Sequence, residues 1–362
     1  MKHLTIVAGA RPNFIKIAPI INSIQNEQKK GTDIQFKLVH TGQHYDKKMS
    51  SDFFDQLQIP EPNANLNAGG GTQAEQTANI MVRFEKYLIE NPTDLVLVVG
   101  DVTSTMACAI VAQKSQIKVA HVEGGIRSND WSMPEEINRL LTDSITNYFF
   151  TTSVIANNNL LASGVKSEQI FFVGNTMIDT LLKQTPNFRK PLLWKEIGLK
   201  EKEYIVMTLH RPANVDQEEG LKKLIEEIIV NSKDLQLVFP VHPRTLKNLE
   251  SISISNPRLH LIEPLGYLEF NYLVKHAKAV ITDSGGITEE TTVMGIPCMT
   301  LRNNTERPET ITTGTNELLG TDPKAVKPAL EKLFSGNWKK GAIPEKWDGK
   351  TAERIVDILI DL

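Results

Sequence analysis

Residues 94–122 read DLVLVVGDVTSTMACAIVAQKSQIKVAHV, and this stretch decides the fold. An apolar run at 94–100 is followed by a helical stretch at 104–114 and by a second apolar run at 118–122. Short runs rich in valine are typical of strands that are buried on both faces, as in parallel sheets. The stretch therefore predicts a strand–helix–strand unit of a parallel sheet.

The same alternation of short apolar runs and longer amphipathic segments extends along the whole chain. In the first half, strands are expected at 4–9, 36–41, 94–100, 118–122, 147–151 and 170–173, with helices at 14–28, 73–89, 104–114, 135–145 and 156–162. In the second half, strands are expected at 204–208, 235–240, 259–262, 279–282 and 297–300, with helices at 220–231, 245–251, 267–276, 288–294 and 323–334.

A polar, lysine-rich stretch at 185–203 separates the two runs, and 362 residues suffice for two domains. We predict the α/β class, with two doubly wound, Rossmann-like domains that face each other across a cleft. The N-terminal domain is expected over 1–172 and the C-terminal domain over 173–350. The last helix, 351–362, is expected to pack back on the first domain.

The composition excludes several classes of protein. The 40 basic and 43 acidic residues give a net charge of −3, which argues against a protein that coats nucleic acid. The two cysteines, Cys108 and Cys298, exclude a disulfide scaffold and indicate a cytoplasmic protein. No segment approaches the roughly 18 apolar residues of a transmembrane helix, and the N-terminus has no signal-peptide pattern. Membrane insertion is therefore not expected.

Polar residues that follow strands are the candidates for a site, because open α/β sheets bind ligands beyond the carboxyl ends of their strands. Arg11, in Gly9-Ala10-Arg11-Pro12-Asn13, could meet a phosphate or carboxylate with its planar fork. Asp101 directly follows the run 94–100 and is a second candidate. For Thr103 and Ser104, which come next, we expect helix capping.

Two further carboxylates follow in the first half. Glu123 comes directly after the run 118–122, and Glu135 comes shortly after it. Ser132 and Glu135 also match a capping box, which would make the role of Glu135 purely local. If Asp101, Glu123 and Glu135 converge at one edge of the sheet, their repulsion raises at least one pKa into the range that is useful for acid–base chemistry.

The second half points to a phosphate. His210-Arg211 follows one strand, and His242-Pro243-Arg244 follows the next. The strongest local signal is Thr282-Asp283-Ser284-Gly285-Gly286-Ile287-Thr288-Glu289-Glu290, which joins a strand to a helix through small residues. The N–H groups at the positive end of that helix predict a diphosphate site, and Glu289 or Glu290 could hold ribose hydroxyls.

Two other kinds of site are not supported. Neither 9–13 nor Gly69-Gly70-Gly71 has the G-x-G-x-x-G spacing of a dinucleotide site, and the glycines precede a capping box at Thr72–Glu75. His40 and His44 are four residues apart, but Gly42 between them disfavours a helix and no Cys/His cluster supports zinc. No metal site is expected.

Taken together, the segments resemble the non-hydrolysing UDP-N-acetylglucosamine 2-epimerases, whose fold is that of GT-B glycosyltransferases. The resemblance runs in family order from residue 9 to residue 309, so it covers nearly the whole chain. The matching segments are Gly9–Pro12, Thr41–Asp46, Gly100-Asp101, His121–Glu123, Met133–Arg139, Gly174–Thr176, Thr208–Arg211, Asp283–Gly286 and Thr305–Glu309.

The resemblance implies roles for individual residues. It implies catalytic roles for Asp101, Glu123, Glu135 and His210. It implies substrate binding, with UDP held by the C-terminal domain, for Arg11, Arg211, His242, Ser284, Gly285, Gly286, Glu290 and Arg307.

The chain departs from the family pattern in two places. Gly124 stands where the family usually has alanine. Gln43-His44-Tyr45-Asp46 stands where members that their own substrate activates read Gln-His-Arg, so Gln43 and His44 mark a candidate regulatory segment.

The resemblance also implies a reaction. UDP leaves C1 as the C2 proton is removed, which gives 2-acetamidoglucal, and UDP then adds back while a proton arrives on the opposite face of C2. This interconverts UDP-N-acetylglucosamine and UDP-N-acetylmannosamine with no redox cofactor and no metal. A UDP-sugar substrate, a homodimer and the supply of N-acetylmannosamine-type sugars to a surface polysaccharide are further implications.

Two alternatives stay open. An epimerase for UDP-2,3-diacetamido-hexuronic acid shares the Gly-Gln-His-Tyr-Asp form of residues 42–46. A GT-B glycosyltransferase, from a different class of enzyme, would share the fold and the UDP site but would also need an acceptor groove, and the sequence shows no sign of one.

Overall fold

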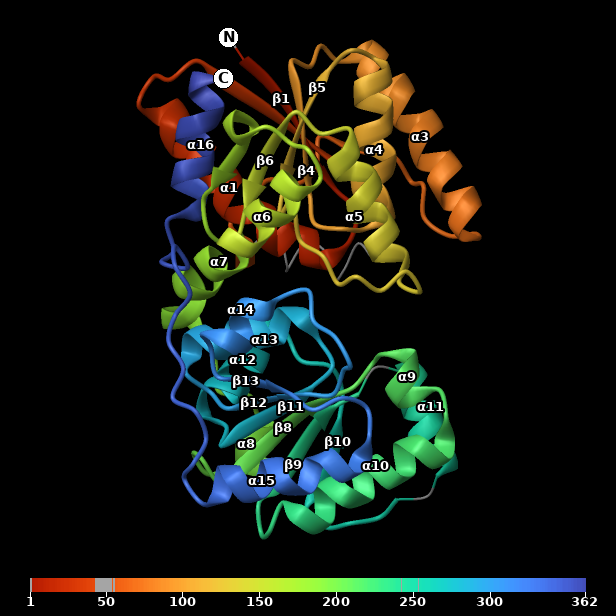
Figure 1. Ribbon diagram of the computed structural model, residues 1–362, viewed down its shortest axis with the longest axis vertical. Coiled ribbons are helices and arrows are strands. Elements are labelled where there is room, and N and C mark those ends of the chain that lie inside the picture. The colour runs from red at the N-terminus through yellow and green to blue at the C-terminus, as the bar shows by residue number, and fades with distance from the viewer. Residues whose placement is uncertain (1, 43–53, 55, 242, 253) are drawn as a thin grey trace. The chain divides into compact units, whose positions relative to one another are not determined.

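The computed structural model describes residues 2–42, 54, 56–241, 243–252 and 254–362. The chain divides into two compact units, Met1–Leu182 with Glu345–Leu362, and Lys183–Pro344. Each unit contains one sheet of parallel strands covered by helices, as Figure 1 shows. The α/β class and the two doubly wound parallel sheets that the sequence predicts are thus confirmed.

The sheet of the first unit has seven strands in the order β3-β2-β1-β4-β5-β6-β7, and every pair is parallel. The strand order changes direction between β1 and β4, which is the position where doubly wound sheets bind ligands. The strands are β1 (Lys2–Ala8), β2 (Ile34–His40), β3 (Ala64–Asn65), β4 (Leu95–Val99), β5 (Lys118–Val122), β6 (Tyr148–Thr151) and β7 (Ile170–Phe172).

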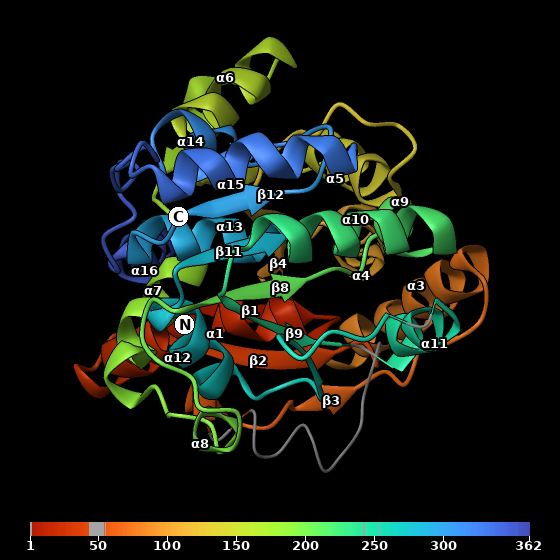
Figure 2. The ribbon, with the colours of Figure 1, turned by 90° about the horizontal axis from the view of Figure 1, so that it is seen from below.

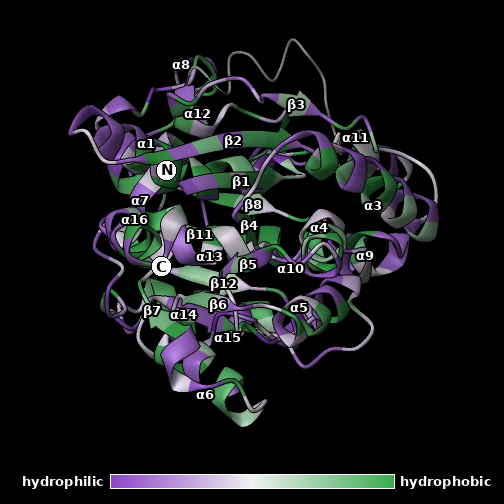
Figure 3. Ribbon diagram, turned by 90° about the horizontal axis from the view of Figure 1, so that it is seen from above, coloured by the Kyte–Doolittle hydropathy of each residue, from purple (hydrophilic) through white to green (hydrophobic). Residues whose placement is uncertain are grey.

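Helices cover both faces of this sheet. Alternate residues of the strands point to opposite faces, so Leu4 and Ile6 of β1 pack in the cluster with α1 and α16, whereas Val7 packs with α3 and α4. In Figure 3 the helices carry hydrophobic and hydrophilic residues along the same ribbon, as expected of helices with one buried face. The helices are α1 (Arg11–Lys29), α3 (Gln73–Glu90), α4 (Thr103–Lys114), α5 (Pro134–Ser144), α6 (Val154–Ala162), α7 (Thr176–Gln184) and α16 (Thr351–Asp361).

The sheet of the second unit repeats this plan with six strands in the order β10-β9-β8-β11-β12-β13. Helices α10 and α15 lie side by side over one face (Figures 1 and 2), and α12 packs on the other. The strands are β8 (Tyr204–Thr208), β9 (Gln236–Pro240), β10 (Leu259–Ile262), β11 (Ala279–Thr282), β12 (Cys298–Thr300) and β13 (Asn316–Leu318). The helices are α8 (Leu193–Glu196), α9 (Pro212–Val215), α10 (Glu218–Asn231), α11 (Pro243–Ser251), α12 (Tyr267–His276), α13 (Gly285–Met294), α14 (Pro308–Thr312) and α15 (Val326–Phe334).

Some expected boundaries were wrong. Helix α13 begins at Gly285, three residues before the expected start, because the two glycines are part of its first turn. Strands β3 and β13 were not predicted, because they have only two and three residues and too few apolar side chains to form a run. Among the described residues, no helix is long and apolar enough to cross a membrane.

Helix α16 completes the core of the first unit. Its residues Ile355, Val356 and Leu359 are fully buried in the cluster that includes α1 and β1. Its N-cap residue, Lys350, provides no side-chain cap, and Oδ2 of Asp179 on α7 instead accepts a hydrogen bond from the Ala352 N–H at 2.7 Å. Burial raises the pKa of Asp179 to about 6.

This raised pKa predicts a pH-dependent stability. The folded state holds the Asp179 proton up to about pH 6, whereas an unfolded aspartate loses it near pH 3.9. The folded state therefore binds more protons between these values, and the free energy of unfolding falls as pH rises through them, by about 3 kcal/mol in total. Asp179→Asn keeps an oxygen for the Ala352 N–H and cannot ionise, so it should stabilise the protein near pH 7.5 and much less near pH 4. Urea unfolding at both pH values measures this, and a difference from wild type that is equal at both would contradict it.

Candidate active site

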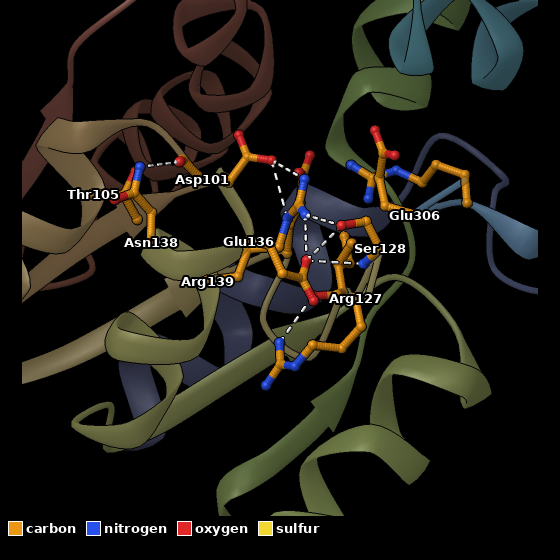
Figure 4. Close-up of polar contacts among 12 residues, drawn as sticks. Asp101, Thr105, Arg127, Ser128, Glu136, Asn138, Arg139 and Glu306 are labelled. Atoms are coloured by element: carbon orange, nitrogen blue, oxygen red, sulfur yellow. Dashed lines mark hydrogen bonds and ion pairs between the residues drawn. The ribbon is translucent and has the colours of Figure 1, made fainter. Parts of the chain in front are cut away.

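Asp101 lies just beyond the end of β4, and α5 holds it in place. The Asp101 carboxylate accepts hydrogen bonds from Arg139, at 3.1 Å from Nε and 2.5 Å from Nη2 (Figure 4). The Asn138 side chain donates to the Asp101 carbonyl oxygen at 2.9 Å. Both the backbone and the carboxylate of Asp101 are therefore fixed by one helix.

Arg139 is in turn held by Glu136, whose carboxylate is buried. Nη1 of Arg139 lies 2.6 Å from Oε2 of Glu136, which also accepts from the N–H and the hydroxyl of Ser128, both at 2.9 Å (Figure 4). Burial alone would raise the pKa of Glu136, but the hydrogen bonds from Ser128, Arg139 and Asn129 outweigh it and lower the pKa. Glu136 is thus an ionised support for Arg139.

Glu123 is buried and lies in an unusual backbone conformation at the end of β5. Its side chain is 3% exposed, and Oε2 lies 2.8 Å from Nζ of Lys16 on α1. Its φ is +72°, a left-handed conformation that costs a residue with a side chain about 1–2 kcal/mol. The Glu123 N–H nevertheless donates to the carbonyl oxygen of Phe150 at 2.9 Å, so the strand pairing continues through it. Strain of this kind is typical of functional sites.

Gly124, the residue after Glu123, packs too closely on its neighbours to leave room for a side chain. A Cβ atom at Gly124 would lie 2.9 Å from Cδ1 of Phe149, so an alanine here requires the ring or the backbone to shift. Glycine in place of the family's alanine therefore allows the loop after Glu123 to pack closely on β6.

Glu135 is the second residue of α5 and is half-buried. The N-cap of α5 is Met133 and its side chain makes no capping bond, so the capping box of Ser132 and Glu135 was a wrong expectation. A carboxylate in the first turn of a helix is stabilised by the positive end of the helix dipole. Glu135 thus has no capping bond that would explain its presence.

The expected helix-capping role of Thr103 and Ser104 was also wrong. Helix α4 has Val102 as its N-cap, without a side-chain hydrogen bond. The Ser104 hydroxyl instead lies 2.7 Å from that of Thr41 in the buried interior, and the Thr103 hydroxyl donates to Gln73 at 3.4 Å. Both hydroxyls therefore link neighbouring segments.

In the second unit, His210 follows β8 and is oriented by Asp283, which follows the neighbouring strand β11. Nδ1 of His210 lies 2.8 Å from Oδ1 of the fully buried Asp283. Asp283 also accepts from the backbone N–H groups of His210 and Arg211 and from the side chain of Asn214. Burial acts to raise the pKa of Asp283, but His210, Asn214 and Arg211 together lower it. An ionised Asp283 fixes Nδ1, so the other ring nitrogen of His210 can face a ligand.

Directly after Asp283, helix α13 begins with an N-cap residue, Ser284, whose side chain makes no capping hydrogen bond. The first turn of the helix starts with Gly285 and Gly286. The first N–H groups of a helix have no partner within the helix and attract anions. The glycines predicted to precede the helix thus form its first turn.

The close approach of the Glu306 side chain explains why residue 285 is a glycine. A Cβ atom at Gly285 would lie 2.6 Å from Oε1 of Glu306. Glu306 is held there by Arg302, with Nη2 at 2.6 Å from Oε2 and Nη1 at 3.2 Å from Oε1.

The two carboxylates later in α13 have different partners. Glu289 is 1% exposed and forms an ion pair with Nε of Arg307, so each side chain balances the charge of the other inside the unit. Oε1 of Glu290 accepts from the Tyr267 hydroxyl at 2.9 Å. Burial, assisted by the charge of Glu289, raises the pKa of Glu290 to about 7.

The remaining candidates are less defined. Arg11 is the first residue of α1 and is exposed. Gln43, His44 and His242 lie outside the described residues. Within the part of the chain that the structure describes, no group of three or more His, Cys, Asp or Glu side chains could hold a metal ion.

Sequence reasoning missed the cations of the first unit and the role of Asp283. Lys16 carries a detectable signal, because it lies three residues after Asn13 on a helix whose other residues from Phe14 to Ile21 are apolar. Asn13 and Lys16 both face the strand ends, where Asn13 donates to the Val99 carbonyl oxygen. The carboxylates Asp101 and Glu123 therefore do not simply repel each other, since Arg139 and Lys16 balance their charges.

Comparison with known proteins agrees with this geometry. A family described as UDP-N-acetylglucosamine 2-epimerase matches residues 26–360. The UDP-N-acetylglucosamine 2-epimerase of Methanocaldococcus jannaschii is 42% identical over 98% of both chains. Its crystal structure in complex with UDP-GlcNAc and UDP has a TM-score of 0.88 and covers 99% of this chain and 100% of that one.

Two further relatives extend the comparison. The S. aureus MnaA–UDP structure is 31% identical, with a TM-score of 0.90, and covers 99% of this chain and 96% of that one. The UDP-2,3-diacetamido-2,3-dideoxy-D-glucuronate 2-epimerase of Pseudomonas aeruginosa is 39% identical over 88% of both chains. The chain therefore belongs to the UDP-N-acetylglucosamine 2-epimerase family, whose members are sugar-nucleotide isomerases.

Proposed function

We propose that this chain interconverts UDP-N-acetylglucosamine and UDP-N-acetylmannosamine without hydrolysis, by elimination of UDP and its re-addition. The observation that carries the proposal lies in the second unit, where Asp283 orients His210 and helix α13 begins directly after Asp283 with two glycines and with no capping hydrogen bond from the Ser284 side chain. We infer the substrate from family membership, because the M. jannaschii relative was crystallised with UDP-GlcNAc and UDP.

We assign the UDP moiety to the second unit. The N–H groups of Gly285 and Gly286 and the side chain of Ser284, whose own N–H donates to Oγ1 of Thr282 at 3.0 Å, would bind the diphosphate, and His210 would stabilise the charge that develops when the bond to C1 breaks. Glu290 lies one turn further along α13 and would accept from the ribose hydroxyls. Arg11, Arg211, His242 and Arg307 are further candidates for contacts with the substrate.

We assign the proton transfers to the first unit. Elimination removes the proton from C2 as the C1–O bond to UDP breaks, which leaves 2-acetamidoglucal. Re-addition forms the C1–O bond again and brings a proton to the opposite face of C2. Asp101, Glu123 and Glu135 are the proposed acid and base groups, since proton transfer at carbon needs a positioned carboxylate on each face.

A second substrate has specific support. The P. aeruginosa relative acts on a diacetamido-glucuronate, and residues 42–46 read Gly-Gln-His-Tyr-Asp, the form found in such enzymes. We rank this substrate second because relatives named UDP-N-acetylglucosamine 2-epimerase match over more of the chain. Turnover of the two substrates in competition decides between them.

We further propose a cytoplasmic homodimer that supplies N-acetylmannosamine units for surface polysaccharide. Both cysteines are buried free thiols, as suits a reducing compartment. Apolar side chains are exposed on α3 (Val82, Ile89) and on α5 (Ile137, Leu141), where a second copy would cover them.

Sedimentation equilibrium should give twice the monomer mass for the wild-type protein. Val82→Glu should shift the equilibrium between dimer and monomer towards the monomer.

Turnover in heavy water tests the elimination. With UDP-N-acetylglucosamine as the sole substrate, the product should carry deuterium at C2, because the carboxylate that takes the proton exchanges it with solvent. Proton NMR of the product measures this. Inertness in the absence of an acceptor would favour the glycosyltransferase alternative, and product without deuterium at C2 would contradict elimination.

The carboxylates should matter for turnover more than for binding. Asp101→Asn, Glu123→Gln and Glu135→Gln keep the shape of each side chain and remove proton transfer, so kcat should fall about a hundredfold or more. Glu168→Gln, an exposed change in the same unit, is the matched control and should keep wild-type kcat. Near-normal kcat for Glu135→Gln would remove that residue from the mechanism.

The UDP assignment predicts the effect of a single glycine. Gly286→Val places a branched side chain in the first turn of α13, against the proposed diphosphate, and should weaken UDP binding at least about tenfold. Isothermal titration calorimetry measures the affinity. Gly220→Val in the first turn of α10 is the control, because a Cβ atom there meets only Cβ of Gln217 at 3.8 Å. Equal UDP affinity of both variants would show that UDP binds elsewhere.

A further inference from the structure

His121 is a fully buried histidine in β5, two residues before Glu123, and the proposed reaction gives it no part. Its Nε2 lies 2.8 Å from the carbonyl oxygen of Gly100, and its Nδ1 lies 2.8 Å from Oδ1 of Asp143. Gly100 immediately precedes Asp101, and Asp143 is in the last turn of α5. The ring therefore joins the end of β4 to the helix that holds Asp101.

Both neighbours of the ring are hydrogen-bond acceptors. The carbonyl oxygen of Gly100 can only accept. Asp143 already accepts from the Gly125 N–H at 3.0 Å and from Nη1 of Arg127 at 2.5 Å. Burial acts to raise the pKa of Asp143, but its contacts with His121 and Arg127 lower it, so the carboxylate is ionised.

Each ring nitrogen of His121 therefore lies against an oxygen atom of an element that flanks Asp101. Asp143, which contacts Nδ1, is in turn bonded to Arg127 of the loop after β5. The residues paired with His121 on the neighbouring strands, Val98 and Phe149, carry no charge.

We infer that His121 is a positioning residue which, through its contacts with Gly100 and Asp143, fixes the two strand ends that carry Asp101 and Glu123. The inference rests on the proposed epimerase reaction, in which these carboxylates transfer protons.

The backbone around Asp101 shows what the ring contributes. The Gly100 N–H donates to the Val122 carbonyl oxygen at 3.0 Å, and its own carbonyl oxygen is bonded to His121. The carbonyl oxygen of Asp101 is bonded to Asn138. With His121 removed, the Gly100 carbonyl and the Asp143 carboxylate each lose their contact with the ring, and the segment that carries Asp101 is released on one side. A displacement of about 1 Å in a reacting group costs about a hundredfold in rate.

Kinetics of His121→Gln test the inference. Glutamine has donors at one end only and cannot reach both acceptors, so kcat should fall about a hundredfold, while UDP affinity, which belongs to the second unit, should change by less than about twofold. His3→Gln is the matched control, because His3 also pairs with a carboxylate, Asp94, but at the surface of the same unit. If wild type epimerises its substrate and His121→Gln keeps kcat within about threefold, the inference is wrong. Absence of epimerisation by wild type itself would instead overturn the proposed function.

Exchange of the ring proton provides a test that needs no activity and no variant. In the wild-type protein labelled with nitrogen-15 in its histidines, NMR should show a ring N–H proton of His121 that exchanges slowly with solvent, because both ring nitrogens are buried and lie against oxygen atoms. Rapid exchange of that proton would overturn the inference, even if the His121→Gln variant failed to fold.

Discussion

Parallel strand direction is the constraint on which the rest of this structure depends. The chain must return to the same end of the sheet before it begins each new strand, so all strands of a unit end at one edge. In the first unit this edge receives Asp101 after β4 and Glu123 after β5, and in the second unit the corresponding edge receives His210 after β8 and Asp283 after β11. Side chains far apart in the sequence are thus brought together by strand polarity before any specific contact forms.

Burying these groups requires a partner for each charge, because an isolated buried carboxylate is strongly destabilising. Lys16 meets Glu123, Arg139 meets Asp101 and Glu136, and Asp143 lies between His121 and Arg127. In the second unit, Asp283 faces His210 and Glu289 faces Arg307. Partners from other elements therefore hold these buried carboxylates at defined positions.

The sequence predicted the strands and the strand-end candidates because both follow from local patterns. Apolar runs such as 95–99 are long enough to identify a buried strand, and the residue after a run is placed by chain direction alone. Partners such as Lys16 for Glu123, which are 107 positions apart, depend on which helix packs over which strand end, and no local pattern contains that. The capping box at Thr72–Glu75 formed as expected, whereas the one at Ser132–Glu135 did not, since α5 begins after Met133. The second motif contains Pro134, which takes the first position of α5 and moves the helix start past Ser132.

The packing of α16 has a consequence for biosynthesis. The first unit is discontinuous in the sequence, and its largest apolar cluster takes Ile355, Val356 and Leu359 from the far end of the described chain. During synthesis, residues 183–344 are made before those side chains, so the first unit lacks part of its core throughout the synthesis of the second. The apolar side of α1 that α16 covers stays open for that interval. A nascent chain of this protein therefore presents a specific hydrophobic surface to chaperones until helix α16 has left the exit tunnel.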